Sequence, residues 1–267
     1  MNVKIPEIGL GTWDLYGKEC SKLVQLALQM GYRHIDTAHI YDNHAAVRKG
    51  IGNFDRSQLF ITSKIFLEKQ LHLPNVEESV EEACDLALKE LGIDYLDLYL
   101  IHWPVEGMPM TKVFQAMENL QRKGKILQVG VSNFTIHHLE DLRQAQCYPT
   151  VNQVEFHPYL YQKDLLEYCN THKIQIVAYR PFGMGALLHD PLLEKIGLAH
   201  QKTPSQVILR WLMQKNIIAI PKSSSENHLK ENLDLSDFSL HKAEIEQIDA
   251  LNKNQRFCMP ESTVFNY

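Results

Sequence analysis

Cysteine is scarce in this chain, and its placement excludes two kinds of structure. The 267 residues contain five cysteines, an odd number, and no two of them form a Cys-x-x-Cys pair. A disulfide framework and a thiolate zinc site are therefore not expected. Scattered, reduced thiols indicate a reducing compartment, so we expect the protein to be cytoplasmic. The five are Cys20, Cys84, Cys147, Cys169 and Cys258.

Long apolar runs and basic runs are also missing. No stretch approaches the roughly 20 apolar residues that cross a bilayer. The N-terminal sequence MNVKIPEIGLG lacks the apolar core of a signal peptide. The formal net charge is −5, and no basic cluster is long enough to hold a phosphate backbone. We therefore expect neither a membrane nor a nucleic-acid partner.

What the chain does contain is an alternation of strand-like and helix-like segments. Several of eight short runs are nearly continuous in apolar residues, as is typical of parallel strands buried on both faces. The alternation predicts an α/β fold, a closed (β/α)8 TIM barrel, as a single domain over residues 1–267. An open doubly wound sheet is the alternative, but its G-x-G-x-x-G sequence is missing after the first run, which reads GLGTW. The predicted strands are Ile8–Thr12, Arg33–Thr37, Leu59–Ile65, Asp97–Trp103, Gln128–Ser132, Val151–Glu155, Gln175–Tyr179 and Ile217–Ile220.

Between the strands, apolar residues recur at the i, i+3 and i+4 spacing of helices. One such segment opens with Thr203 as N-cap and Pro204 in the first turn. Gly31, Gly92 and Gly124 follow three others, where a residue with positive φ can end a helix. The helices that we predict are Cys20–Met30, Val76–Leu91, Thr111–Arg122 and Thr203–Gln214.

Four polar residues stand at or just after the ends of predicted strands. In a (β/α)8 barrel, these ends meet at one face and carry the active site. Tyr41 is the candidate proton donor for a carbonyl oxygen, and the Lys64 ammonium would lower the pKa of its phenol. Asp36 would keep Lys64 charged, and a neutral His102 would orient the carbonyl. A buried ion pair or a core histidine could explain each residue alone, but hardly all four together.

Seven segments in order resemble the aldo-keto reductases through nearly the whole chain. That resemblance implies a (β/α)8 barrel that reduces aldehydes and ketones with NADPH, without a metal and with Tyr41 as proton donor. NADH would bind with lower affinity. The segments are GLGTW from Gly9, GYRHIDTAHIYDN from Gly31, FITSK from Phe60, LGIDYLDLYLIHWP from Leu91, GVSNF from Gly130, NQVEFHPY from Asn152 and IPKSSSENHLKEN from Ile220.

The same resemblance assigns cofactor contacts along the predicted barrel end. Ser132, Asn133 and Gln153 resemble the side chains that bind the nicotinamide carboxamide, and Tyr179 resembles the ring that stacks on it. The adenosine 2′-phosphate and adenine contacts would be Lys222, Ser223, Ser225 and Asn232. Three further residues complete the expected contacts: Thr12 and Trp13 at the end of the first strand, and Arg180 after the seventh.

The chain departs from the family pattern at two positions and in two loops. His228 replaces the usual arginine at the phosphate, and Arg180 replaces the usual serine and offers charge to the pyrophosphate. The loops after Pro104 and Pro181 are short, so the cofactor flap is expected to be missing and the pocket open. Its walls would be Trp13, Phe66 and Trp103, with the irregular tail around Phe257 lying across the barrel mouth.

Other functions remain open at this point. Thirteen histidines occur without an H-E-x-x-H or similar spacing, so no metal site is expected. Lys64 could instead act as the nucleophile of a Schiff-base lyase, or the chain could be a non-catalytic nicotinamide-binding sensor. The expected partner is a small carbonyl compound. The oligomeric state is not indicated.

Overall fold

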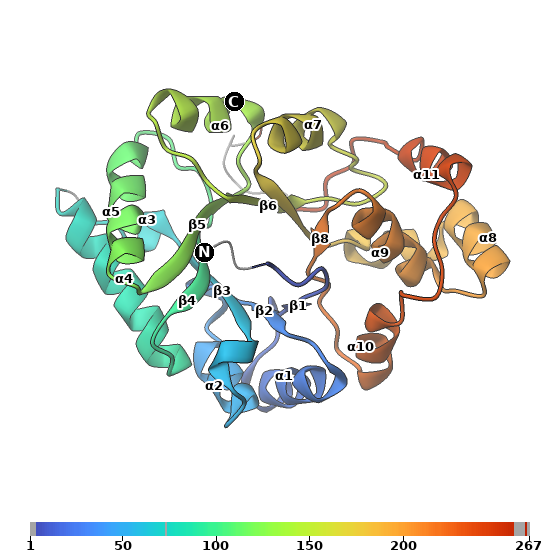
Figure 1. Ribbon diagram of the computed structural model, residues 1–267, viewed down its shortest axis with the longest axis horizontal. Coiled ribbons are helices and arrows are strands. Elements are labelled where there is room, and N and C mark those ends of the chain that lie inside the picture. Colours follow the sequence, from blue (N-terminus) through green and yellow to red (C-terminus); the bar gives the residue numbers. More distant parts are fainter. Residues whose placement is uncertain (1–3, 73, 259–264, 266–267) are drawn as a thin grey trace.

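The barrel closes between its first and last strands, β1 (Leu10–Gly11) and β8 (Ile218–Ala219). The computed structural model describes residues 4–72, 74–258 and 265, and within them eight parallel strands pair in chain order. Ile8 pairs with Ala219, and Gly11 pairs with Lys222, which joins the two edges of the sheet. The predicted (β/α)8 barrel is confirmed, and Figure 1 shows the helices arranged around the strands.

The strands occur where the apolar runs predict them: β6 (Val151–Glu155) and β7 (Gln175–Tyr179) have the predicted bounds, β5 (Ile126–Ser132) begins two residues earlier, and most of the others are shorter. The run predicted from Ile8 to Thr12 narrows to β1, and the run predicted to end at Trp103 is β4 (Leu96–Ile101). His102 is therefore the first residue after its strand. The others are β2 (His34–Asp36) and β3 (Phe60–Ile65).

The four predicted helices are present. α4 (Val76–Leu91) has the predicted bounds, and α9 (Pro204–Gln214) follows Thr203, whose hydroxyl accepts the Gln206 N–H. α1 (Gly17–Met30) and α5 (Met110–Arg122) begin slightly earlier than predicted. The remaining helices are α2 (His44–Ile51), α3 (Leu67–Gln70), α6 (Ile136–Gln144), α7 (Lys163–Thr171), α8 (Pro191–His200), α10 (Glu226–Leu233) and α11 (Lys242–Asp249), with 3-10 turns η1 (His39–Tyr41), η2 (Arg56–Gln58) and η3 (Gly183–His189).

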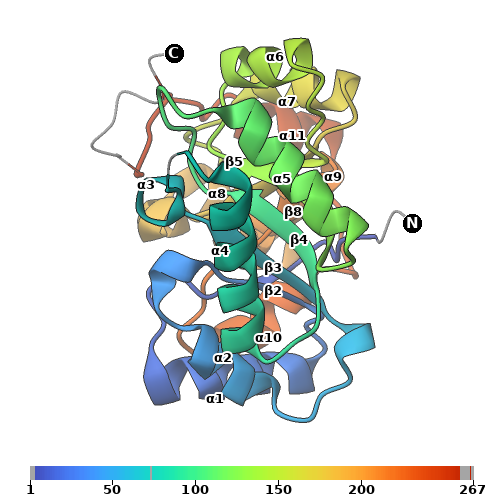
Figure 2. The same cartoon turned by 90° about the vertical axis from the view of Figure 1, so that its left-hand side faces the viewer.

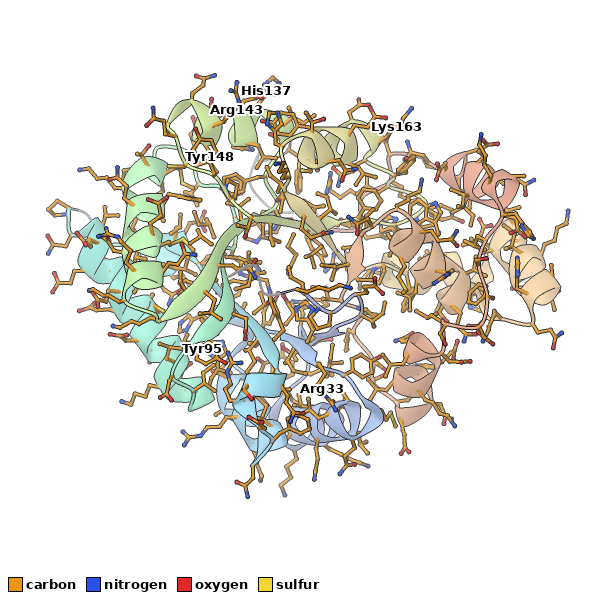
Figure 3. The ribbon with its side chains drawn as sticks, in the orientation of Figure 1. Arg33, Tyr95, His137, Arg143, Tyr148 and Lys163 are labelled. Atoms are coloured by element: carbon orange, nitrogen blue, oxygen red, sulfur yellow. The ribbon has the colours of Figure 1, made fainter. Side chains whose placement is uncertain are left out.

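The helices form an outer layer whose apolar faces cover the barrel. α4 and α5 lie side by side on one flank, as the two views show (Figures 1 and 2). Polar side chains on the outer helices, such as Arg143 and Lys163, point away from the strands (Figure 3). No helix in the part of the chain that the structure describes is long and apolar enough to cross a membrane.

The period of two along each strand determines which side chains face the barrel interior. Phe60 on β3 and Leu100 on β4 belong to a small apolar cluster formed from several strands. Counting by twos from Phe60 leads to Lys64, and from Leu100 to His102. Both polar side chains therefore stand above this apolar cluster, at the C-terminal end of the barrel.

Candidate active site

A cavity of about 590 Å³ opens at the C-terminal ends of the strands. Most of the residues expected from the sequence to form the site line it, although they come from distant parts of the chain. They are Trp13, Asp36, Tyr41, His102, Trp103, Ser132, Asn133, Gln153, Tyr179, Arg180, Lys222, Ser223, His228 and Asn232.

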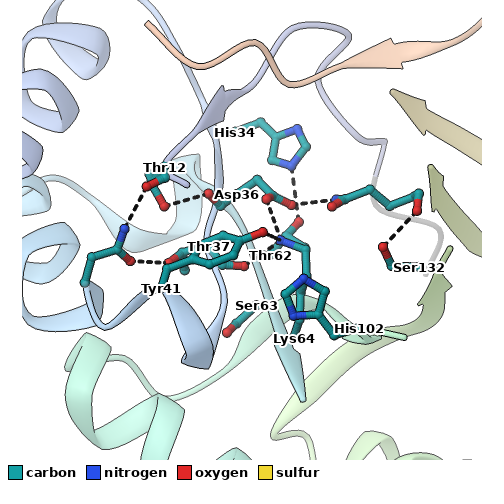
Figure 4. A network of polar contacts seen from close by, with 12 residues as sticks. Thr12, His34, Asp36, Thr37, Tyr41, Thr62, Ser63, Lys64, His102 and Ser132 are labelled. Atoms are coloured by element: carbon teal, nitrogen blue, oxygen red, sulfur yellow. Dashed lines mark hydrogen bonds and ion pairs between the residues drawn. The ribbon is translucent and has the colours of Figure 1, made fainter. Parts of the chain in front are cut away.

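Lys64 lies beneath the cavity and links two of the four expected catalytic side chains. Its Nζ donates to Oδ1 of Asp36 at 2.6 Å and to the phenol oxygen of Tyr41 at 3.4 Å. It also donates to the Thr37 carbonyl at 2.8 Å, so every ammonium proton has an acceptor. Figure 4 shows this network with His102 beside it. The ring of His102 meets that of Tyr41 edge-on, with centroids 5.7 Å apart.

Burial and the fixed charges shift the pKa values of this group in opposite directions. Burial alone would lower the pKa of Lys64, but Asp36 and Tyr41 raise it above its usual value. Burial raises the pKa of the Tyr41 phenol, and the Lys64 ammonium only partly opposes this. Lys64 thus acts on the pKa of Tyr41 in the expected direction, but desolvation outweighs the charge and the net pKa is raised. Burial, assisted by Lys64, holds the pKa of His102 well below its usual range, so the ring is neutral.

The second carboxylate oxygen of Asp36 connects this group to the amide side of the cavity. Asp36 Oδ2 accepts a hydrogen bond from Nε2 of Gln153 at 2.7 Å. The Ser132 hydroxyl donates to the main-chain carbonyl of Gln153. The Tyr179 hydroxyl donates to the side-chain oxygen of Asn133 at 2.7 Å. Amide and hydroxyl groups thus stand next to the Lys64 network.

The turn that carries Tyr41 is held by polar contacts to the segment that follows the first strand. Asn43 follows η1 and donates from Nδ2 to the carbonyls of Thr12 and Leu15, at 2.8 and 3.0 Å. The Thr37 hydroxyl donates to Oδ1 of the same Asn43 at 2.7 Å. Because Asn43 is buried, these three bonds hold both ends of η1 and direct Tyr41 toward Lys64.

Four residues of the expected site lie off the cavity surface. Lys64 is covered by the network above it. Thr12 is fully buried and donates to the Asp36 carbonyl at 2.9 Å, so it supports β2. Phe66 meets His102 edge-on from the side, at 6.0 Å between centroids. Ser225 is the N-cap of α10, and its hydroxyl accepts the His228 N–H at 3.2 Å.

Two contacts join the loop after β1 to the loops after β7 and β8. The Arg180 guanidinium lies over the Trp13 ring, 4.9 Å from its centroid. Lys222 Nζ lies 3.3 Å from Oδ2 of Asp14. Asp14 also lines the cavity, a role that its position in the sequence did not indicate.

The described part of the C-terminal tail reaches the mouth of the barrel at Phe257 and Cys258 and contributes a residue that the sequence did not single out. The buried carboxylate of Glu155, at the end of β6, accepts the backbone N–H groups of Phe257 at 2.7 Å and Cys258 at 2.9 Å. Cys258 consequently lines the cavity. This placement depends on a contact over 103 positions, which no local pattern reveals.

Comparison with known proteins agrees with the geometry. Residues 7–253 match the Aldo/keto reductase family. The chain belongs to this family. It is 45% identical over 259 residues to the glyoxal reductase of Bacillus subtilis, covering 95% of this chain and 91% of the relative. It is also 45% identical over 265 residues to the uncharacterized oxidoreductase YtbE of the same species, with the same two coverages.

Solved aldo-keto reductases share the fold. An enzyme from a Medee basin deep-sea metagenome library superposes with a TM-score of 0.91 at 37% identity, covering 97% of this chain and 95% of the other. The aldose reductase of Schistosoma japonicum superposes with a TM-score of 0.90 at 32% identity, covering 96% of this chain and 91% of the other. The chain is therefore an oxidoreductase of the aldo-keto reductase type.

Proposed function

We propose that this aldo-keto reductase reduces aldehydes and ketones to alcohols with NADPH, and that Tyr41 donates the proton. The observation that carries the proposal is the position of the Lys64 ammonium, between Asp36 and the Tyr41 phenol at the floor of the cavity. The B. subtilis relative named glyoxal reductase supports a small carbonyl compound as the substrate.

The position of Lys64 suits Tyr41 as a proton donor. A phenol is protonated at neutral pH, and burial raises the pKa of Tyr41 further, so release of its proton depends on stabilising the phenolate. When the proton leaves, the phenolate that forms lies 3.4 Å from the Lys64 ammonium, which stabilises it. Neutral His102, whose ring adjoins Tyr41, can hydrogen-bond the same carbonyl oxygen and orient it.

The residues around the cavity fit a nicotinamide dinucleotide. Ser132, Asn133 and Gln153 offer amide and hydroxyl groups for the carboxamide, and Tyr179 offers an aromatic face. Further along, the cavity is lined by Lys222, Ser223, His228 and Asn232 near the N-terminus of α10, where a phosphate is favoured. When bound, NADPH supplies the hydride that adds to the carbonyl carbon.

The arrangement of side chains argues against both alternatives, the Schiff-base lyase and the non-catalytic sensor. A Schiff-base lyase needs an unprotonated amine, but Asp36 lies 2.6 Å from the Lys64 ammonium and raises its pKa. Borohydride with a carbonyl substrate should therefore fail to trap Lys64. A purely cofactor-binding sensor would not need Tyr41, Lys64 and His102 grouped around one point of the cavity.

Steady-state oxidation of NADPH with glyoxal and simple aldehydes tests the proposal. Wild-type protein should turn over, and Tyr41→Phe should lose about two to four orders of magnitude in kcat while still binding NADPH. Tyr148→Phe, at a tyrosine that is 65% exposed, is the matched control and should retain activity. Near-wild-type turnover by Tyr41→Phe would show that Tyr41 is not the proton donor. Cofactor binding without any turnover by the wild type would favour the sensor.

A further inference from the structure

Two histidines and a glutamate come together behind the turn that carries Tyr41, outside the cavity. His39 lies in η1, His44 is the first residue of α2, and Glu90 lies near the end of α4. One nitrogen or carboxylate oxygen from each lies within 4.8 Å of the others. The sequence does not indicate this group, because Glu90 follows His44 by 46 positions.

His44 is the fixed member of this group. Its side chain is buried, and its Nδ1 lies 2.8 Å from Oε2 of Glu90. Its Nε2 lies 3.1 Å from the Ser63 hydroxyl, on the strand that also carries Lys64. Histidines that bind metals commonly have their second ring nitrogen hydrogen-bonded in this way, because the bond fixes the ring and its tautomer.

One ring nitrogen of His39 lacks a hydrogen-bond partner among the described residues. This atom, Nδ1, is buried. A buried polar atom without a partner is unfavourable, and a bound cation would satisfy it. The His39 and His44 rings lie 6.3 Å apart between centroids, close enough for both to reach one ion.

We propose that His39, His44 and Glu90 form a binding site for a borderline divalent cation such as Zn²⁺. Two imidazoles and one carboxylate are a ligand set that zinc favours, with water completing four-coordination. Ligands of a tetrahedral zinc ion lie roughly 3.3 Å apart, since each bond is about 2.0–2.2 Å long. His39 and Glu90 are only partly buried, so their side chains can close around the fixed His44.

The positive charge of Lys64 does not exclude an ion. Lys64 follows Ser63 on β3, and its ammonium opposes a cation at this position. Asp36 pairs with that ammonium at 2.6 Å and offsets much of its charge, while Glu90 contributes a negative charge to the site itself. Because His39 and Tyr41 share η1, the ion would tie the proton-donor turn to α2 and α4.

Titration of the purified full-length protein, free of any affinity tag, tests the site. Zn²⁺ binding is measured by calorimetry, and Co²⁺ serves as a probe because its visible spectrum reports four-coordinate nitrogen and oxygen ligands. One equivalent should bind to the wild type. Glu90→Gln and His39→Asn should each weaken binding about tenfold or more, since each removes one ligand. Both positions are partly exposed, so both variants should fold, which circular dichroism checks.

Two matched variants distinguish this site from other ligands in the chain. His72→Asn removes an exposed histidine elsewhere, and Cys258→Ser removes the thiol that lines the cavity. Both should bind Zn²⁺ as the wild type does. The proposal is overturned if the wild type binds no ion, if Glu90→Gln and His39→Asn bind with wild-type affinity, or if Cys258→Ser abolishes binding.

Discussion

The Lys64 ammonium lies 2.6 Å from Oδ1 of Asp36, and both side chains are buried. Asp36 meets Gln153 with its other oxygen, at 2.7 Å. One carboxylate thus connects the side of the site that we assign to proton donation with the side that we assign to the carboxamide. A change at either partner should therefore affect both halves.

Replacing Lys64 with methionine tests its electrostatic role in the proposed reaction. Lys64→Met keeps the length of the side chain but removes the charge that would stabilise the Tyr41 phenolate. We expect kcat at neutral pH to fall by about two orders of magnitude or more. Lys64→Arg keeps the charge in another position and should retain partial activity. The measurement is the steady-state rate of NADPH oxidation for each variant.

Two controls accompany the lysine variants. Lys163→Met, at an exposed lysine on α7, should have wild-type rates. Thermal melting is needed because Lys64→Met leaves the buried Asp36 without its counter-ion, which is destabilising. If folded Lys64→Met reduces aldehydes as fast as the wild type, the ammonium has no electrostatic role.

Much of this architecture is predictable from local sequence patterns. The apolar run DLYLI gave β4, and its period of two aligns Leu98 and Leu100 with His102 on the barrel interior. The bounds of α4 follow from its helical spacing and from Gly92, whose φ of 66° ends the helix. These features depend on residues that are close together in the chain, so they can be predicted from the sequence alone.

The contacts that assemble the site are not local. The bond between Gln153 and Asp36 spans 117 positions, and those from Glu155 to the tail span more than 100. The family resemblance predicts that Thr12 contacts the cofactor, whereas in the structure its hydroxyl donates to the Asp36 carbonyl. Which face such a residue presents depends on how the first and second strands pack, and no short pattern specifies this.

Stability at acidic pH should depend on His34. Burial lowers the pKa of His34 to about 4, against about 6.5 for an unfolded histidine. As pH falls from about 6.5 to about 4, the unfolded chain gains a proton that the folded protein does not. The free energy of unfolding should therefore decrease across this window, by on the order of 3 kcal/mol from this residue. Above pH 6.5, both states are neutral and this contribution is constant.

Urea unfolding at several pH values measures this effect. His34→Asn should have a shallower loss of stability between about pH 6.5 and 4 than the wild type. His189→Asn, at an exposed position, should retain the wild-type slope. Identical slopes for His34→Asn and the wild type would show that His34 does not resist protonation in the folded state.

Substrate selection should be loose. α5 begins at Met110, soon after Pro104, and α8 begins at Pro191, so neither connection is long enough to form a large lid. Trp13, one wall of the cavity, is 43% exposed. Because few side chains enclose the substrate, aldehydes, dicarbonyls and aromatic aldehydes should have kcat/KM values within a few decades of one another. Turnover of one compound alone would contradict this expectation.

The cofactor preference should favour NADPH over NADH, but moderately. Lys222 and Ser223 line the cavity near the N-terminus of α10, where they can bind a 2′-phosphate. Charge-assisted hydrogen bonds contribute about 1.5–3 kcal/mol each, which is one to two decades of affinity. The family resemblance implies an arginine at the position of His228, and an imidazole lacks the permanent charge and bidentate geometry of a guanidinium.

His228→Arg should therefore tighten NADPH by about one decade or more, while NADH, which lacks the 2′-phosphate, should change little. Dissociation constants for both cofactors, measured by quenching of protein fluorescence, give the two ratios. His72→Arg adds the same charge at an exposed position distant in sequence from His228. It should leave the dissociation constants for NADPH and NADH unchanged. Equal tightening of NADH and NADPH by His228→Arg would mean that position 228 does not contact the 2′-phosphate.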